Sequence, residues 1–471
     1  MNEAPAAIEI GADVRASHRA LGPLNEEFLD YVAAEPACRR RANFAVLEHA
    51  AFYPLASWPV FLGLEQRDEM ARASIAVTRL LKTVPGRIFR GDMERLAAFY
   101  QLANPTLAGL ILEEPNGIEA AIARVDLVLG SAGLKVLEVN LGAPGGLQVA
   151  AAEDTVRAIP ELRRFFDQVV GHRPCWTTNS LAELLDHVLE DVLAHVTPSA
   201  GDLNVGFVAD VEFPPEIQRA VVDYVNSVYG PVLRRRAPGR TGEVVVGSFL
   251  DLVSRADGVY FGAAPLAGII ELVATQWLAS FHHWKSRQVA LYNGPVAILL
   301  DDKRNLGFLS EFARSPLFTA EERAVVERWV PWTRAVKTGY TSWRGERVNL
   351  PELLGREREN LVLKPAQSSQ GNGVLIGAGT PPASWETAVR EALARSDWVV
   401  QEFHESLPYL CQYGEEGVAV HDFIWGIFVF GSRYGGGFLR MMPRGRNLPI
   451  NAAKGAQEGI VFELDQPQGG V

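Results

Sequence analysis

The sequence predicts an α/β protein built from several domains. Three observations support this prediction: the length of 471 residues, a middle region in which apolar runs alternate with helical stretches, and a last third with two strand pairs. At roughly 150 residues per domain, the chain is long enough for two to four packed units. Its 48% hydrophobic and 21% charged residues are typical of a globular protein with a large buried core.

The first two parts of the chain differ in their hydrophobic period. Residues 1–110 are predicted to be mainly helical, because apolar residues in "DEMARASIAVTRLLKTV" recur every three or four positions. Residues 111–175 contain "RVDLVLG" and "KVLEVN", two short apolar runs joined by the turn-forming "SAG". We therefore expect a helical N-terminal part followed by a pair of strands.

Residues 176–300 predict a Rossmann-like domain. The runs "LNVGFVAD", "EVVVGSF", "GVYFG" and "PVAILL" are compact and apolar, as buried strands are, and the helical stretch "PPEIQRAVVDYVNSVYG" follows the first of them. In residues 301–471 we expect a helix, a strand pair around "NLVLKPAQSSQGNGVLIG", the helix "WETAVREALAR" and the strand "WVVQEF". The stretch "DFIWGIFVFGSRYGGGFLRMMP" then predicts a long antiparallel hairpin.

Charge and cysteine content restrict the partners and the compartment. A formal net charge of -11 argues against nucleic acid and membrane surfaces, because their phosphates would be repelled. Cys38, Cys175 and Cys411 are far apart and lack metal-binding spacing, which favours buried thiols in a reduced, cytoplasmic setting. No signal peptide and no apolar run of membrane-spanning length is found. We expect a soluble protein, whose oligomeric state the sequence does not indicate.

The segment from Lys364 to Gly373, "KPAQSSQGNG", predicts a phosphate-binding hairpin loop. A lysine that closes one strand, followed by small residues, can place an ammonium group and backbone N–H groups around phosphate oxygens. The alternative is a surface hairpin with an exposed lysine, and no Walker sequence is present. Lys303 follows the run "VAILL" at a predicted helix start; alone it indicates a solvated lysine, but lysines in this order occur in one class of ATP site.

Two further segments carry polar residues at strand ends. Gln401 and Glu402 end the strand "WVVQEF", whose backbone can bind an adenine edge, and Glu405 can accept a ribose hydroxyl. Arg440 leaves a glycine-rich strand, where its planar fork of donors suits a transferring phosphoryl group or a substrate carboxylate. The alternatives are a solvent-facing carboxylate and a surface salt bridge.

The stretch "KVLEVNLGAPGG" combines an acid and an amide with a glycine turn. Glu138 and Asn140 are two residues apart on a strand and therefore share a face, which Asp126 can join from the neighbouring strand. Such oxygen ligands suit Mg²⁺, and a polar group on a buried strand is costly unless it is paired. Arg124 shares the face of Asp126 and can hold an anionic substrate group. The spacing of "GAPGG" fits a dinucleotide fingerprint poorly, so a nicotinamide or flavin site is the weaker alternative.

Together, these segments resemble the ATP-grasp enzymes, in the circularly permuted order of the branch that includes glutathionylspermidine synthetase-like proteins. The metal-binding E-x-N motif comes first here, followed by the middle α/β unit, Lys303, "VLKPAQSSQGNGV", "VVQEF" and "GGGFLR". The resemblance includes "RWVPWTRAVKTG" and extends from about residue 50 to 464.

The resemblance implies an ATP-grasp fold and a role for each candidate residue. Asp126, Glu138 and Asn140 would hold Mg²⁺, and Arg124 and Arg440 would stabilise the acyl-phosphate and tetrahedral states. The remaining roles concern ATP: phosphate contacts from Lys303 and Lys364, a mobile loop comprising Ser368, Ser369, Gln370, Gly371 and Gly373, an adenine hinge at Gln401, Glu402 and Phe403, and a ribose contact from Glu405. The family has an acidic residue at Asp422 and an asparagine near Asn451, whose roles the resemblance leaves open.

The function predicted on this basis is an ATP- and Mg²⁺-dependent ligase that joins a small carboxylic acid to an amine. Positioning and positive charge around the transferring phosphoryl group would lower the barrier. Two alternatives use the same ATP site: a phosphotransferase that modifies a small molecule, and a nucleotide-binding subunit without catalysis. The middle region alone also permits a dinucleotide-dependent oxidoreductase.

Overall fold

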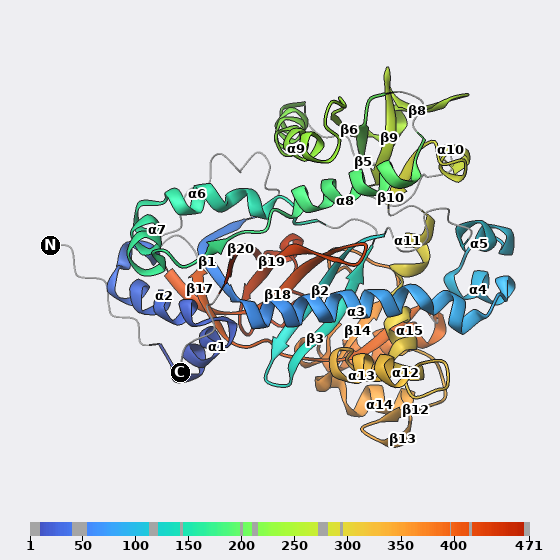
Figure 1. The fold of residues 1–471 in the computed structure, drawn as a ribbon. Helices are drawn as coiled ribbons and strands as arrows, with labels where there is room; N and C mark the ends of the chain where they lie inside the picture. Colours follow the sequence, from blue (N-terminus) through green and yellow to red (C-terminus); the bar gives the residue numbers. More distant parts are fainter. Residues whose placement is uncertain are drawn as a thin grey trace.

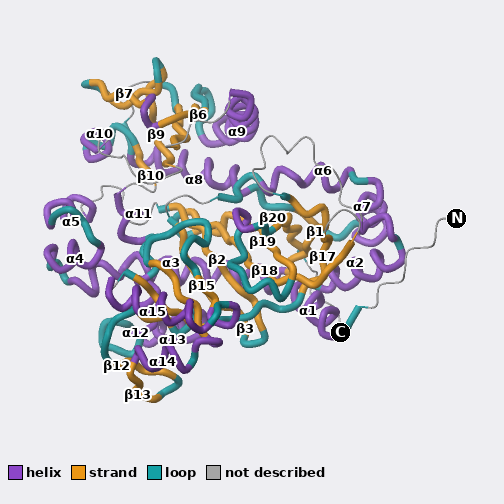
Figure 2. Tube along the Cα trace, turned by 180° about the vertical axis from the view of Figure 1, so that it is seen from behind, coloured by secondary structure: helices purple, strands orange, loops and turns teal. Residues whose placement is uncertain are grey.

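Three main sheets organise the chain. The computed structural model describes residues 10–39, 54–112, 121–141, 145–197, 201–209, 215–271, 281–292, 295–395, 397–413 and 417–465. Within these residues an eight-stranded central sheet, a six-stranded middle sheet and a four-stranded sheet are present, with one separate two-stranded hairpin. Figures 1 and 2 show the middle sheet with its helices on one side of the central sheet and the four-stranded sheet with its helices on another.

The central sheet joins strands from both halves of the chain. Its order is β1-β20-β19-β18-β2-β3, and β17 and β4 pair with β18 and β20. All pairs are antiparallel except β1 with β20. The bounds are β1 (Leu55–Gly63), β2 (Ile122–Gly130), β3 (Gly133–Asn140), β4 (Cys175–Trp176), β17 (Tyr409–Tyr413), β18 (Gly417–Phe430), β19 (Arg433–Pro443) and β20 (Gln457–Leu464).

Both predicted strand pairs are present in this sheet. β2 and β3 form a hairpin, and β18 and β19 form a longer one whose turn includes Gly431 with a φ of 61°. Glycine adopts this left-handed conformation without the steric cost that other residues meet. The pairing of β18 with β2 then places the late hairpin beside the early one.

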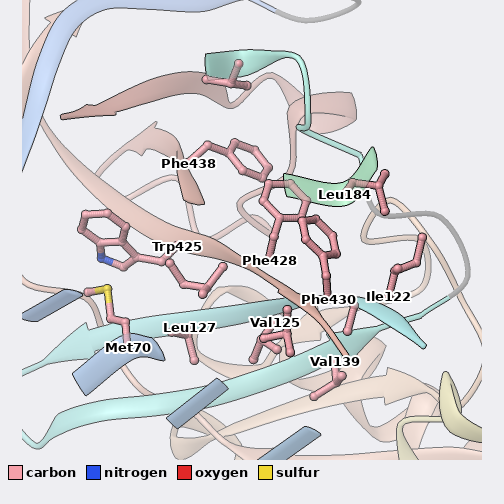
Figure 3. Close-up of a cluster of buried hydrophobic side chains, with 14 of the residues drawn as sticks. Met70, Ile122, Val125, Leu127, Val139, Leu184, Trp425, Phe428, Phe430 and Phe438 are labelled. Carbon is pink, nitrogen blue, oxygen red and sulfur yellow. The ribbon is translucent and has the colours of Figure 1, made fainter. Parts of the chain in front are cut away.

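Different helices cover the two faces of the central sheet. α3 (Leu64–Phe89) packs on one face and α8 (Ser180–His195) on the other. Figure 3 shows Met70 of α3 near Trp425 and Leu127, and Leu184 of α8 near the rings of Phe428 and Phe430. Successive residues of a strand point to opposite faces, and the even-numbered residues of β18 and β2 share the face that packs on α8. Arg124 and Asp126 of the candidate site lie on this face.

The N-terminal part is not purely helical. Besides α1 (Ala12–Leu21), α2 (Pro23–Ala34), α3, α4 (Met93–Tyr100) and α5 (Pro105–Leu112), it supplies the edge strand β1. Every residue of β1 is buried, so it lacks the polar alternation by which a half-exposed strand is recognised, and it contains Pro59. α6 (Glu153–Ala158) and α7 (Pro160–Phe165) pack nearby, on the same side as the N-terminal helices.

The middle domain contains a Rossmann-like parallel layer. β6, β5, β9 and β10 are parallel neighbours, and β8 and β7 extend the sheet in antiparallel fashion. The bounds are β5 (Asn204–Ala209), β6 (Val244–Ser248), β7 (Leu252–Arg255), β8 (Gly258–Phe261), β9 (Ala264–Glu271), β10 (Ala290–Tyr292), α9 (Pro215–Arg236) and α10 (Phe281–Lys285).

One predicted strand of this region is wrong. The run "PVAILL" forms the short helix α11 (Pro295–Leu300), not a strand. Periodicity cannot separate a strand from a helix in six consecutive apolar residues, and Pro295 begins the helix at a position where its missing N–H costs nothing. Lys303 therefore follows a buried helix, although it does precede the predicted next helix, α12 (Arg304–Phe312).

The last domain has its own sheet and core. The sheet order is β11-β16-β14-β15, and Trp385, Leu353 and Leu363 belong to a separate buried cluster. The bounds are β11 (Thr333–Ala335), β12 (Tyr340–Trp343), β13 (Glu346–Asn349), β14 (Leu361–Pro365), β15 (Leu375–Ile376), β16 (Trp398–Glu402), α13 (Ala320–Trp329), α14 (Leu350–Arg356) and α15 (Pro382–Arg395). The predicted strand pair, helix and strand are thus confirmed as β14–β15, α15 and β16.

Cys38 and Cys411 are buried free thiols, as predicted, and Cys175 is half-buried. Burial raises the pKa of Cys38 and Cys411 to about 12, which keeps both protonated at neutral pH. A search of the described helices finds none that is both long and apolar enough to cross a membrane.

Candidate active site

A cleft lies between the central sheet and the four-stranded sheet. It encloses about 1200 Å³, part of it open to solvent. Twelve of the sixteen predicted site residues line it: Arg124, Asp126, Glu138, Asn140, Lys364, Gln370, Gly371, Gln401, Glu402, Phe403, Glu405 and Arg440. Asp422 and Asn451 line it as well, whereas Lys303, Ser368, Ser369 and Gly373 lie outside its wall.

Strand register brings the predicted metal ligands together. Asp126 of β2 is directly opposite Glu138 of β3, and Arg124 is opposite Asn140. Paired residues on adjacent strands share a face of the sheet, so all four side chains face the cleft. The Asn140 side chain also donates from Nδ2 to the Arg124 carbonyl oxygen at 3.3 Å.

A β-bulge completes this arrangement. The register of β2 and β3 shifts between Asp126 and Leu127, which leaves Leu137 as the extra residue of β3. The Leu137 carbonyl oxygen accepts from Lys364 Nζ at 3.4 Å and from Gln401 Nε2 at 3.3 Å. Because a bulge frees a backbone group from the ladder, β3 can bind the lysine-bearing sheet across the cleft.

Asp126 is held by two arginines. Its carboxylate accepts from Arg124 Nε at 2.9 Å and forms an ion pair with Arg440 Nη2 at 2.7 Å. Burial alone would raise the pKa of Asp126, but the two guanidinium groups outweigh burial and lower the pKa to about 2. Asp126 is therefore an anion at neutral pH.

Lys303 supports the cleft from behind. Its Nζ forms an ion pair with Glu138 Oε1 at 3.1 Å and donates to the Ser368 carbonyl oxygen at 2.7 Å. Burial would lower the pKa of Lys303, yet Glu138 and Asp301 raise it, so the lysine is charged. The buried ion pair of Asp302 and Arg304 fixes the chain on either side of it. Lys303 thus connects a predicted metal ligand to the hairpin loop.

Lys364 is the buried cation within the cleft. Its Nζ donates to Gln401 Oε1 at 2.8 Å, and Gln401 Nε2 donates onward to Thr333 Oγ1 at 3.1 Å. Burial lowers the pKa of Lys364 to about 8, and its hydrogen-bond acceptors are the neutral oxygens of Leu137 and Gln401. Gln401 thus positions this lysine through its side chain.

The predicted hinge offers fewer free backbone groups than expected. Glu402 N donates to the Trp332 carbonyl oxygen and Phe403 N to the Asn360 carbonyl oxygen, each at 2.8 Å. The cleft wall at this end includes the apolar side chains of Val362, Ile376 and Phe403, which suit a flat aromatic ring.

Two predicted polar residues are tied to their surroundings. Asp422 accepts from Arg444 Nε at 2.8 Å and from Ser406 Oγ at 3.2 Å. Asn451 Oδ1 accepts from the Ala453 N–H at 2.9 Å. Both line the cleft while these bonds fix their orientation.

The three predicted metal ligands fit a magnesium ion only in part. Among the described residues, no three Asp, Glu, His or Cys side chains gather closely enough to hold a metal by themselves. Asp126, Glu138 and Asn140 supply two carboxylates and an amide on neighbouring positions of one face. Mg²⁺ is commonly held by one or two carboxylates together with substrate phosphates and water, so this donor set fits an ion that arrives with a nucleotide.

Sequence analysis missed one ionisable residue of the site. Glu458 of β20 is opposite Arg440 in the sheet register, and burial raises its pKa to about 7 although Arg440 and Arg124 oppose the shift. Gln148 Nε2 donates to Glu458 Oε2 at 3.5 Å. The signal in the sequence was a glutamate within the mainly apolar run "QEGIVFEL".

The glycine turn packs against the site. Residues 142–144 of "GAPGG" lie outside the described residues, but the Gly145 carbonyl oxygen accepts from Arg124 Nη1 at 2.9 Å. Gly146 has a φ of 102°, and a Cβ there would lie 2.3 Å from the Phe438 ring. The turn therefore positions Arg124 and covers Phe438.

Gly146→Ala should destabilise the protein by about 1–3 kcal/mol, because it combines an unfavourable φ with a steric clash. Thermal melting measures the effect. Gly145→Ala is the matched control, since among the described residues its Cβ would approach only Arg124 Nη1, at 3.8 Å. Equal melting temperatures for the two variants would contradict this account of the turn.

Comparison with known proteins establishes the fold. No protein-family profile and no curated protein matches the sequence. Among solved structures, the apo form of a glutathione synthetase-like effector (GSS30) from Globodera pallida covers 93% of this chain and 97% of its own, with a TM-score of 0.52 and 11% identity. A protein named as a gamma-glutamylcysteine synthetase from Methylobacillus flagellatus KT covers 80% and 85%, with a TM-score of 0.41 and 12% identity.

The chain thus has the α/β, ATP-grasp-like fold of a glutathione synthetase-like protein, as predicted. Along the chain, β2 and β3 precede the parallel middle layer, which is followed by β14–β16 and the β18–β19 hairpin, as the permuted order predicts. At 11% identity, the likeness shows the fold alone.

Proposed function

We propose that the protein is an ATP- and Mg²⁺-dependent ligase that joins a small carboxylic acid to an amine. The observation that carries this proposal is the convergence of Lys364, Arg440, Arg124 and the Asp126–Glu138 pair at one cleft between two sheets. These five ionisable groups from distant parts of the chain would be costly to bury together unless a charged ligand uses them.

ATP would lie in the cleft, with its base against the apolar end and its phosphates toward Lys364 and Arg440. Asp126, Glu138 and Asn140 would hold Mg²⁺, which would neutralise phosphate charge when bound. The loop residues Gln370 and Gly371 line the cleft near Asn451, as expected of backbone that closes over phosphates.

In the proposed reaction, an oxygen of the substrate carboxylate bonds to the γ-phosphorus and the bond to ADP breaks. An amine then bonds to the acyl carbon, phosphate leaves, and the amine loses a proton. Arg440 and Lys364 would stabilise negative charge on the transferring group, and Arg124 would orient the carboxylate. The chain contributes mainly position and charge.

The decisive experiment is an ADP-release screen that pairs small carboxylic acids with amines. A ligase releases ADP only when both are present, and hydroxylamine traps the activated acid. Formation of AMP, or a stable phosphorylated product without any amine, would reject the ligase in favour of another nucleotide-dependent reaction.

The activity should also depend on the charge of Lys364. Because its pKa is lowered to about 8, the charged fraction falls as the pH rises through that value. We expect kcat/KM for ATP to decline above about pH 8, and kcat to decline at higher pH, since bound phosphate favours the charged lysine. A pH profile of both parameters tests this, and a flat kcat/KM up to about pH 10 would contradict it.

A further inference from the structure

Arg440 is buried but incompletely bonded. The residue is 5% exposed, and its Nη2 lies 2.7 Å from Asp126 Oδ2. Nevertheless, neither Nε nor Nη2 has a hydrogen bond of good geometry to any described residue. Nη2 has the Asp126 carboxylate beside it, but Nε has no hydrogen-bond acceptor among the described residues, and because buried donors are normally satisfied, Nε points to an acceptor that binds in the cleft.

The ion pairs of Asp126 leave little room for a cation. Arg124 Nε is 2.9 Å from Oδ1, and Arg440 Nη2 is 2.7 Å from Oδ2, so each carboxylate oxygen faces a guanidinium group. A divalent cation on Asp126 would stand beside two positive charges. It can bind well only after one guanidinium moves or a negative ligand arrives.

Arg440 is the guanidinium with an alternative place to bind. Arg124 is also fixed by the Gly145 carbonyl oxygen, whereas Arg440 faces the open cleft and has Glu458 opposite it on the next strand. A phosphate group offers two acceptor oxygens that match the fork of the guanidinium. Such a group would accept from Nε, offer Nη2 a second acceptor and release Asp126.

We infer that Arg440 competes with the divalent cation for Asp126, so that the cation and the phosphates of the nucleotide bind interdependently. This inference rests on the proposed function for the identity of the phosphate ligand, and on the Arg440–Asp126 ion pair for the competition. Coupling between two ligands is reciprocal, so each should tighten the binding of the other by the same factor.

The test measures binding of Mn²⁺, as a substitute for Mg²⁺, to the full chain. The electron paramagnetic resonance signal of free Mn²⁺ reports how much of the ion is unbound. After subtraction of the Mn²⁺ that a non-hydrolysable ATP analogue binds in a protein-free control, we expect the analogue to tighten Mn²⁺ binding to the unsubstituted protein about tenfold or more. Mn²⁺ that binds equally tightly with and without the analogue would overturn the inference, and this measurement needs no variant.

Arg440→Gln isolates the competition. It should bind Mn²⁺ alone about tenfold more tightly than the unsubstituted protein, and the effect of the analogue should shrink. Arg87→Gln is the matched control: it removes the same charge from an ion pair outside the cleft, with Glu322 at 2.6 Å, and should leave Mn²⁺ binding unchanged. Folded Arg440→Gln with unchanged or weaker Mn²⁺ binding would overturn the inference.

The outcome is separable from that of the ligase proposal. If Arg440→Gln tightens Mn²⁺ binding but no acid and amine pair releases ADP, the competition is supported and the ligase is rejected. If ADP release depends on both substrates but Arg440→Gln leaves Mn²⁺ affinity unchanged, only the competition is rejected.

Discussion

Lys364→Met should lower the rate of ADP release about 10²- to 10³-fold, which is the usual effect of removing one preorganised positive group from a reaction centre. Methionine keeps most of the length of the side chain but cannot donate to Gln401 or to a phosphate. Because burial disfavours the charge of Lys364 and lowers its pKa to about 8, the substitution should not destabilise the fold. Steady-state kinetics and thermal melting measure the two effects.

The matched control for this variant is Lys337→Met. Lys337 belongs to the same domain, but its side chain is 53% exposed and pairs with Glu311 at 3.3 Å. Its loss should leave ADP release unchanged. If Lys364→Met kept full activity, the phosphates would have to bind elsewhere.

Asp302→Ala should lower the free energy of unfolding by about 3–5 kcal/mol, because it removes the carboxylate that pairs with a buried arginine. The side chains of Asp302 and Arg304 are 0% and 4% exposed, and Arg304 Nη2 lies 2.6 Å from Asp302 Oδ2. The same pair flanks Lys303, so its loss should also displace the lysine that binds Glu138. Chemical denaturation, with activity measured in parallel, tests both effects.

A second pair in the same domain serves as the control. Arg395 and Asp397 are also two residues apart and approach to 2.6 Å, but their side chains are 67% and 21% exposed. Surface pairs contribute about 0–1 kcal/mol, so Asp397→Ala should have little effect. Equal denaturation midpoints for Asp302→Ala and Asp397→Ala would show that burial does not strengthen the first pair.

The sequence predicted those parts of the fold that depend on local pattern. Alternating or apolar runs bounded by turn residues identified β2, β3, β14, β16, β18 and β19. The strand β1 escaped prediction because it is buried throughout and pairs with β20 from the other end of the chain. The run at Pro295–Leu300 was misread because six apolar residues fit either element.

The sequence predicted most of the residues of the candidate site, but not the contacts between them. The spacing of Glu138 and Asn140 placed them on one face, and register with β2 added Asp126. No local pattern could show that Asp126 binds two arginines, that Gln401 binds Lys364, or that Glu458 is opposite Arg440. These contacts follow from the pairing of strands that are distant in the sequence.

The pairing of β1 with β20 has a consequence for synthesis on the ribosome. The edge strand β1 lies near the start of the chain and can pair with β20 only after residues 457–464 have been synthesised. Until then, β1 exposes an unpaired, mainly apolar strand, which is a template for association with other chains. We therefore expect nascent chains to require chaperone protection, and C-terminal truncations before β20 to aggregate even though every residue lining the cleft is present.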